Sequence, residues 1–268
     1  MIVPAKQPRI LISCYYEKSF KGEDIVQHHA FAYQITGSLI VQDGKEKVVF
    51  EPRDFRFNVR NKLARFVKQP GEAEPFRSLS IQFDEETLRE FAAEHHLASA
   101  PLSNTPPSFQ LKKHPLLQNF VDSLQQSLPY FSEGNDDLVK LKLNEALIVM
   151  LKVQPELKDI LFNFQTPGKI NLKAFMEKNF RYNLSLARFA YLTGRSISSF
   201  QRDFLREFSV TPAKWLQDKR LNEAYFLLKE GNYTTSEVFS EVGFEDLSHF
   251  SRVFKNYFGI NPSSVSRK

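Results

Sequence analysis

The first third of the chain has the polar and apolar pattern of short β-strands. Between residues 8 and 83, β-branched and aromatic side chains alternate with polar ones, as they do in half-buried strands. The runs with this pattern are 9–13, 31–35, 38–41, 55–59, 64–67 and 78–83. Within Val41–Phe50, Asp43-Gly44 supplies the two positive-φ positions that a tight hairpin turn requires. Many short strands at this spacing predict a β-sandwich or barrel.

From Asp84 onward the apolar spacing becomes helical. We expect helices at Glu85–His96, Leu116–Leu128 and Asp137–Val153, with proline-containing breaks around residue 101 and at Thr166-Pro167-Gly168. The fold class is therefore α+β. The expected organisation is a domain over residues 1–153 (strands 8–83, helices 85–153), a linker over 154–170 and a helical domain over 171–268.

The predicted helix 116–128 carries an apolar stripe with two interpretations. Its members are Leu116, Leu117, Phe120, Val121 and Leu124. Helical periodicity fits a seam between two copies of the chain as well as it fits packing onto the chain's own barrel. Both alternatives stay open at this point.

The last hundred residues contain an internal repeat with a period of fifty residues. Ser198, Arg202, Phe204 and Pro212 recur as Ser248, Arg252, Phe254 and Pro262. In each copy a short helix, a glycine turn and a second helix follow one another. The first copy is Leu186–Leu192, Gly194 and a helix from Ser196; the second is Ser236–Val242, Gly243 and a helix from Asp246. The sequence therefore predicts two helix-turn-helix motifs in tandem.

The second helix of each copy has two contrasting faces. One face carries phenylalanines four residues apart, at 200, 204 and 208 and again at 250, 254 and 258. The opposite face is rich in hydrogen-bond donors that suit phosphate oxygens and the base edges of a major groove. A connecting helix over Thr211–Leu228 would be about 27 Å long, close to the ~34 Å between neighbouring major-groove sites on one side of DNA.

Charge supports a polyanionic partner for this repeat. Residues 169–268 hold 16 Lys+Arg and 10 Asp+Glu, a net +6 in a chain whose total is +5. The remaining residues are therefore close to neutral. This difference in charge predicts that the basic module, residues 169–268, binds nucleic acid and that the neutral module does not.

Several other chemistries find little support. The single cysteine, Cys14, excludes an intrachain disulfide and a cysteine-built zinc site, and we expect it to be a buried small side chain. His28 and His29 are adjacent, so in a strand they point to opposite faces and cannot bind one metal ion from there. We expect no cofactor. The aliphatic run Ala146–Leu151 is too short to cross a bilayer, and the N-terminus lacks a signal-peptide core, so we expect a cytoplasmic protein.

Residues 171–268 resemble the AraC-type transcription regulators. The residues that carry the resemblance include Phe189-Ala190, Thr211-Pro212, Trp215, Arg220-Leu221, Val242-Gly243-Phe244, Phe250-Ser251-Arg252, Gly259 and Pro262. The resemblance implies base contacts from Ser198, Gln201 and Arg202 in the first motif and from His249, Ser251 and Arg252 in the second. Phosphate contacts are assigned to Ser196, Arg206, Ser248 and Lys255. The chain departs from the family pattern at Ser209, where glycine is usual, at Phe239, where alanine is usual, and at Thr235, where isoleucine is usual.

The N-terminal half resembles the cupin-type barrel of such regulators, in the branch that includes activators of type III secretion genes. Gly37-Ser38-Leu39, Asp43-Gly44 and Glu51-Pro52-Arg53-Asp54 are spaced like the barrel's turns, with Arg53 where glycine is common. Some members of the branch are controlled by a protein partner instead of a small effector. Bulky Phe31, Tyr33 and Ile35 alternate along one strand face, which favours a barrel filled with side chains.

These observations predict a sequence-specific DNA-binding regulator controlled through its N-terminal barrel. The expected partners are double-stranded promoter DNA, RNA polymerase, a second copy of the chain, and an effector or regulatory protein of unknown identity, with no membrane. The alternative is a cupin-type metal-dependent enzyme with an accessory DNA-binding tail.

Overall fold

The computed structural model of the chain describes residues 9–17, 19–43, 46–99, 105–131, 135–164, 168–231 and 233–265. The chain divides into two compact units, Met1–Phe164 and Gln165–Lys268, so the boundary lies inside the expected linker. The first part of that linker range was wrong, however. It holds a 3-10 turn at Pro155–Leu157 and the helix α4 (Lys158–Leu161), and Leu157 and Leu161 are fully buried in the core of the first unit.

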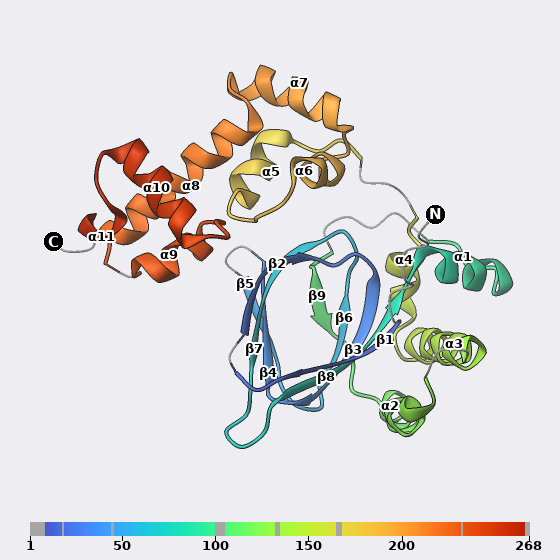
Figure 1. Ribbon diagram of the computed structural model, residues 1–268. Helices are drawn as coiled ribbons and strands as arrows, with labels where there is room; N and C mark the ends of the chain where they lie inside the picture. The colour runs from blue at the N-terminus through green and yellow to red at the C-terminus, as the bar shows by residue number, and fades with distance from the viewer. Residues whose placement is uncertain are drawn as a thin grey trace. The chain divides into compact units, whose positions relative to one another are not determined.

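The N-terminal unit contains two antiparallel sheets that curve around a barrel (Figure 1). In spatial order one sheet comprises β1 (Ile10–Tyr15), β8 (Phe76–Phe83), β3 (His29–Thr36), β6 (Phe55–Asn58) and β9 (Ser108–Gln110). The other comprises β2 (Ser19–Ile25), β7 (Leu63–Gln69), β4 (Ser38–Asp43) and β5 (Glu46–Phe50). The expected strands are confirmed, whereas β2 and β9 were missed. The predicted hairpin is present, since Asp43 pairs with Glu46, while Gly44 lies outside the described residues.

Helices cover the outer face of the five-stranded sheet (Figure 1). They are α1 (Glu85–Glu94), α2 (Pro115–Ser127), a 3-10 turn at Leu128–Tyr130, and α3 (Asp136–Val153). Each helix begins within one residue of its predicted start. Phe31 and Tyr33 point outward from β3 into this helical layer, where the Phe31 ring meets the edge of Phe120 at 5.9 Å.

The outward direction of Phe31 and Tyr33 corrects the expectation of a filled barrel. Strand side chains alternate between the two faces of a sheet, so the bulky residues lie on the helical side and the smaller Ala30 faces the interior. A cavity of about 360 Å³ lies between the two sheets. The hydrophobic alternation was read correctly, but it was assigned to the wrong face.

The structure assigns the apolar stripe of α2 to the packing alternative. Leu117, Phe120, Val121 and Leu124 are buried in the core of their own unit, and Leu116 is 41% exposed. Four of the five candidate seam residues are therefore already covered within one chain and are not available to a second copy.

Cys14 was wrongly expected to be buried. It lies on β1, an edge strand of the five-stranded sheet, where it pairs in register with Arg77, and its thiol is exposed and free. Ser13 borders the barrel cavity, so Cys14 and Ile12 share the outer face of β1, and both are exposed because the helical layer does not cover this part of the strand.

The C-terminal unit is all-helical and follows the predicted repeat. Its elements are α5 (Leu172–Asn179), α6 (Leu186–Leu192), α7 (Ile197–Phe208), α8 (Pro212–Lys229), α9 (Thr235–Glu241), α10 (Leu247–Phe258) and α11 (Pro262–Val265). Each motif has its own apolar core, one around Phe200 and Phe204 and the other around Phe250 and Phe254. In the described ranges, no helix is long and apolar enough to span a membrane.

Candidate nucleic-acid interface

The first helix-turn-helix motif is built by α6, a turn at Gly194 and α7. Gly194 adopts φ +67°, the left-handed backbone that glycine tolerates best. Ser196 caps α7 by accepting a hydrogen bond from the Ser199 N–H at 3.2 Å. The Phe200 and Phe204 rings are completely buried, and Phe204 packs edge-on against Trp215 of α8 at 5.7 Å. One face of α7 is thus fixed by packing.

The opposite face of α7 is free of such packing. Ser198, Gln201, Arg202 and Arg206 are all exposed, and the side chains of Arg202 and Arg206 have 74% and 77% of their surface open to solvent. These are the four residues that the sequence places at the interface on this helix. The structure brings them together on one helix surface.

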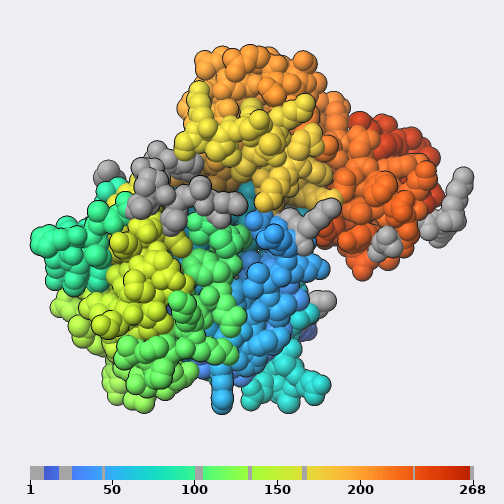
Figure 2. All heavy atoms as spheres, turned by 180° about the vertical axis from the view of Figure 1, so that it is seen from behind, coloured from blue at the N-terminus to red at the C-terminus, as the bar shows by residue number. Residues whose placement is uncertain are grey.

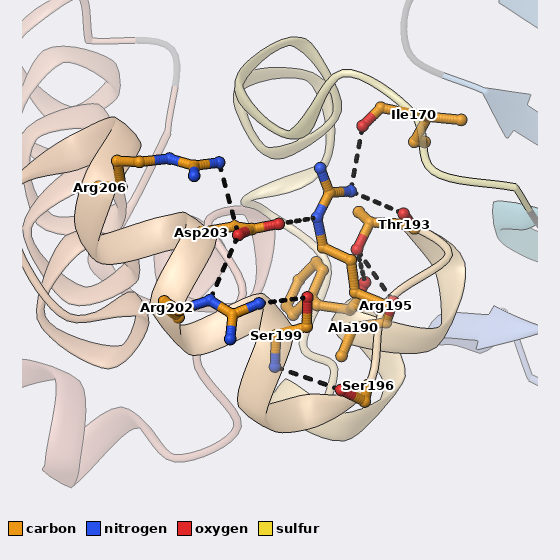
Figure 3. Close-up of polar contacts among 10 residues, drawn as sticks. Ile170, Ala190, Thr193, Arg195, Ser196, Ser199, Arg202, Asp203 and Arg206 are labelled. Carbon is orange, nitrogen blue, oxygen red and sulfur yellow. Dashed lines mark hydrogen bonds and ion pairs between the residues drawn. The ribbon is translucent and has the colours of Figure 1, made fainter.

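Asp203 lies behind this face and holds three arginines (Figure 3). Its Oδ2 is 3.1 Å from Nε of Arg195, while its Oδ1 lies 3.9 Å from Nε of Arg202 and 3.5 Å from a terminal nitrogen of Arg206. The hydrogen bond from Arg195 keeps the pKa of the Asp203 carboxyl below its ordinary value, so the carboxylate is charged at neutral pH. The longer distances leave Arg202 and Arg206 loosely held.

Arg195 has a structural role that the sequence did not reveal. Its side chain is only 10% exposed, and it also donates to the backbone carbonyls of Thr193 at 2.7 Å and Ile170 at 3.1 Å (Figure 3). One available signal was a break in the repeat. Fifty residues on, the positions of Arg195 and Asp203 are taken by Glu245 and Val253, so this pair belongs to the first motif alone.

The second motif repeats the arrangement with a different cap. Asp246 accepts a hydrogen bond from the His249 N–H at 2.5 Å at the start of α10, and Phe250 and Phe254 are fully buried. The exposed residues of this helix include Ser248, His249, Arg252 and Lys255. Ser251 is only half exposed, which makes it the least accessible of the candidate base contacts.

The segment 180–183, between α5 and α6, links the two motifs by hydrogen bonds and ion pairs to α8 and α9. Arg220 of α8 donates to the carbonyls of Phe180 and Tyr182, both at 2.8 Å. Arg181 pairs with Glu223 of α8 and lies 3.9 Å from Glu241 of α9. From the sequence, Arg220 is as well suited to reach DNA as to hold the domain together through Asp218 or Glu223. The structure shows it bound to backbone carbonyls.

Asn183 provides a further contact between the two motifs. Its side-chain amide donates a hydrogen bond to the carboxylate of Glu245, just before α10, at 2.5 Å. Segment 180–183 leads into α6, and its Phe180 packs in the apolar core of the first motif, whereas Glu241 and Glu245 belong to the second motif. These bonds therefore limit changes in the separation of α7 and α10. The two exposed polar faces are therefore carried by one braced unit.

Two departures from the family pattern are accommodated, one by the backbone at Ser209 and one by side-chain packing at Phe239. Ser209 ends α7 in the left-handed conformation, at φ +59°, just as Gly259 ends α10 at φ +75°. A serine at such a C-terminal cap carries a steric cost that glycine avoids. Phe239 is half-buried against the core of the second motif, so the larger side chain is packed there.

His29 fits a structural role better than a metal-binding one. The described residues contain no group of three or more His, Cys, Asp or Glu that could hold a metal ion. The ring of His29 is buried and stacks on Phe57 at 5.5 Å, and Nδ1 accepts from the Arg60 N–H at 3.3 Å. Burial lowers the pKa of His29 to about 3, so the imidazole is neutral at pH 7.

Two family models match this chain and together cover both units. The one described as "ExsA N-terminal regulatory domain" matches residues 29–160, and the one described as "Helix-turn-helix domain" matches residues 189–268. The first match includes most of the barrel strands and helices α1–α3. The second includes the exposed faces of α7 and α10.

Individual proteins with similar sequences are transcription regulators. An uncharacterized HTH-type transcriptional regulator of Haemophilus influenzae is 29% identical over 58% of this chain and 52% of its own length. The HTH-type transcriptional regulator ExsA of Pseudomonas aeruginosa is 25% identical over 85% of this chain and 82% of its own length. The virulence regulon transcriptional activator VirF of Yersinia enterocolitica is 29% identical over 35% of each chain.

Among solved structures, that of ToxT from Vibrio cholerae aligns over 96% of this chain and 97% of its own, with 14% identity and a TM-score of 0.44.

Proposed function

Because this chain is an AraC-type DNA-binding transcription regulator with an ExsA-like N-terminal regulatory domain, we propose that it reads promoter DNA through the exposed faces of α7 and α10. Ser198, Gln201 and Arg202 contact bases from α7, and Ser196 and Arg206 contact phosphates. His249, Ser251 and Arg252 contact bases from α10, and Ser248 and Lys255 contact phosphates. The protein acts as an activator and engages RNA polymerase.

One observation carries this proposal. On α7 the donors proposed for DNA are exposed, while the opposite stripe is sealed into the core by Phe200 and Phe204. Arginine forms bidentate hydrogen bonds with guanine, and glutamine does so with adenine, in the major groove, which is wide enough to admit a helix. The arrangement presents Gln201 and Arg202 on the side from which such a groove would be approached.

The two motifs are proposed to differ in how firmly they specify sequence. Ser251 is half exposed, and α10 lacks the buried Arg195–Asp203 pair that braces α7. We therefore assign more of the base discrimination to α7 and more of the non-specific affinity to α10.

Lys255→Ala is expected to weaken binding about equally for all DNA sequences. Lys255 is exposed on the last turn of α10, where its ammonium can neutralise one phosphate. The slope of log K against log salt should fall by about one unit in magnitude. Fluorescence anisotropy titrations of the full chain, over a series of salt concentrations, measure that slope.

The matched control for Lys255 is Lys140→Ala, which removes an exposed lysine from the N-terminal unit. Its salt slope should equal that of the unaltered chain. A Lys255→Ala slope equal to that of this control would remove Lys255 from the interface.

We propose that two copies of the chain associate through the outer face of α3. With Leu117, Phe120, Val121 and Leu124 of α2 already buried, the exposed apolar residues on the helical layer include Leu141 and Ile148 of α3, which are 62% and 51% exposed. They are seven residues apart, so they share one face of the helix and can meet the same pair on a second copy. Figure 2 shows the helical segment α2–α4, coloured green to yellow-green, forming a continuous surface of the N-terminal unit.

Replacing both Leu141 and Ile148 with aspartate is expected to raise the dimer dissociation constant at least about tenfold, because charged groups in an apolar seam lose hydration without gaining partners. Sedimentation velocity over a range of concentrations measures this constant. Val49→Asp, which places the same charge on an exposed apolar residue of the edge strand β5, should leave it unchanged. A double variant that dimerises like the unaltered chain would rule out this face.

The regulatory step is proposed to be a population shift. A signal at the N-terminal unit favours the arrangement in which two DNA-binding units meet two promoter half-sites together. The cavity inside the barrel favours a small-molecule signal over control by a protein partner alone, because a barrel without such a role has no need of an open, polar interior.

A further inference from the structure

Asp203 occupies a position that an apolar residue fills in the second motif. Its side chain is 9% exposed, and that of its ion-pair partner Arg195 is 10% exposed. Fifty residues on, Val253 takes the matching position, packs against the core of the second motif and leaves α10 as regular as α7. A buried ion pair is often no more stabilising than apolar side chains of similar size. The carboxylate on α7 therefore points to a role other than folding.

The two oxygens of the Asp203 carboxylate have different surroundings (Figure 3). Oδ2 accepts a hydrogen bond from Nε of Arg195 at 3.1 Å. Arg195 is held in turn by two backbone carbonyls, so the interior of the motif sets the orientation of the carboxylate. Oδ1 faces the exposed arginines, with Nε of Arg202 at 3.9 Å and a terminal nitrogen of Arg206 at 3.5 Å. It is a fixed acceptor whose two neighbouring cations are both too far away for a strong hydrogen bond.

The two exposed arginines approach Oδ1 through different nitrogens, and this difference decides which of them can stay there on DNA. Arg206 uses a terminal nitrogen, so a bidentate contact between its two terminal nitrogens and a phosphate would break its contact with Asp203. Arg202 uses Nε, which leaves both of its terminal nitrogens for another acceptor. The contact that one of them makes with the Ser199 hydroxyl is long, at 3.5 Å, and is easily replaced. Arg202 can therefore keep Asp203 while it binds a base.

We propose that Asp203 is a positioning residue for base reading by Arg202. When DNA draws Arg206 to a phosphate, Oδ1 accepts a hydrogen bond from Nε of Arg202. This bond holds the plane of the guanidinium so that its two terminal nitrogens meet the O6 and N7 acceptors of one guanine. A guanidinium that is already oriented loses less side-chain entropy on binding. The inference rests on the proposed base contact of Arg202 and adds the residue that orients it.

The test is a double-mutant cycle between Asp203→Asn and Arg202→Ala, measured by fluorescence anisotropy on the full chain. The probes are a promoter fragment footprinted with the unaltered chain and the same fragment with its bases scrambled. With Arg202 present, Asp203→Asn should weaken binding to the promoter fragment about fivefold or more, because a neutral amide holds a guanidinium less firmly than a carboxylate does. In the Arg202→Ala background, the same substitution should change affinity by less than about twofold. A merely structural role for Asp203 would give the same loss in both backgrounds.

The expected loss has the opposite sign to a simple charge effect. Removing a carboxylate from a DNA-binding face would by itself strengthen binding to every sequence, because less negative charge repels the phosphates. Asp203→Asn should therefore bind the scrambled fragment at least as tightly as the unaltered chain does. Glu207→Gln is the matched control, since Glu207 is an exposed carboxylate on the last turn of the same helix. It should bind both fragments at least as tightly as the unaltered chain and keep the same base preference.

A second variant keeps the test valid if the first does not fold. Asp203→Asn leaves Arg195 buried without its counter-ion, which is destabilising. Replacing both residues, Arg195→Met with Asp203→Val, removes the pair and gives α7 the valine that α10 has at the matching position. Trp215 is the one tryptophan of the chain and packs on Phe204, so its fluorescence reports whether the first motif is folded. The loss of promoter affinity in this variant should depend on Arg202 in the same way.

Either of two results overturns the proposal. One is a loss of promoter affinity that is equal with and without Arg202, and the other is a promoter affinity that Asp203→Asn leaves unchanged or raises. Failure of the proposed function gives a different result, in which Arg202→Ala weakens binding to all sequences alike. In that case the base contact is wrong and the positioning role with it. A base-specific loss from Arg202→Ala without coupling to Asp203 overturns the positioning role alone.

Discussion

Gly243→Ala is expected to destabilise the C-terminal unit by about 2–5 kcal/mol and to abolish DNA binding at physiological temperature. Gly243 has φ +93°, and residues other than glycine pay about 1–2 kcal/mol for left-handed backbone. A Cβ at this position would also lie 2.3 Å from the Arg181 carbonyl oxygen, which is far inside contact distance. Relieving such an overlap typically costs a further 1–3 kcal/mol or so.

The clash would be with backbone, and that is why the effect should be large. Residues 180–182 are held by Arg220, whose guanidinium donates to the carbonyls of Phe180 and Tyr182. Movement of the Arg181 carbonyl away from the new methyl group would strain these bonds. The expected loss is a large part of the total stability of a typical domain, which is about 5–15 kcal/mol.

Guanidinium unfolding, followed by Trp215 fluorescence and by helical circular dichroism, measures the loss. Gly259→Ala is the matched control, because Gly259 also has a positive φ of +75° but nothing lies within 4 Å of its would-be Cβ. The control should cost only about 1 kcal/mol. Equal midpoints for the two variants would show that close approach of the Arg181 backbone does not matter.

Arg202→Ala is expected to weaken binding to the cognate promoter by about 1–3 kcal/mol, or roughly 5- to 150-fold, and to relax the preference at one base pair. The side chain is 74% exposed, and its contacts within the protein are long, at 3.9 Å to Asp203 and 3.5 Å to Ser199. Removing it should therefore change folding stability by less than about 0.5 kcal/mol. The affinity loss then reports a contact with DNA.

Anisotropy titrations against a footprinted promoter fragment, and against the same fragment with each base pair changed in turn, measure this effect. Arg206→Ala is the matched comparison, since Arg206 is on the same helix, is 77% exposed and also approaches Asp203. It should weaken all fragments alike and reduce the salt slope. If Arg202→Ala behaved in the same way, Arg202 would contact phosphate and not a base.

The repeat made the helices of the two motifs and the connecting helix predictable from the sequence to within about a residue, whereas α5 and α11 were missed. Local signals coincide there: Ser196 and Asp246 are caps, Gly194 and Gly243 are turns, and the phenylalanine stripes define the buried faces. The barrel strands with clear alternation were found for the same reason. β9 was missed because its three residues are too few to show a period, and it exists only because β6 offers an edge for pairing.

The candidate interface was also readable from the sequence, because exposure on an amphipathic helix follows from spacing alone. The ion pairs and hydrogen bonds that hold this interface in place could not be predicted from the sequence. Arg195 and Asp203 are eight residues apart, and nothing local distinguishes them from surface charges; only the packed motif brings them to 3.1 Å and buries both. The contacts of Arg181, Asn183 and Arg220 likewise join residues about forty to sixty positions apart.

The sequence by itself determined which faces of the helices and strands are apolar, where the turns fall and where positive charge gathers, because these depend on neighbours a few residues away. Only the tertiary structure decided what each apolar face packs against. It placed Phe31 and Tyr33 under the helical layer, covered Leu117, Phe120, Val121 and Leu124 of α2, and left Arg56 lining a hollow barrel. Periodicity specifies which face is apolar but not which surface covers it. The hydrophobic effect is non-directional, so burial against any complementary apolar surface lowers the free energy of folding by a similar amount.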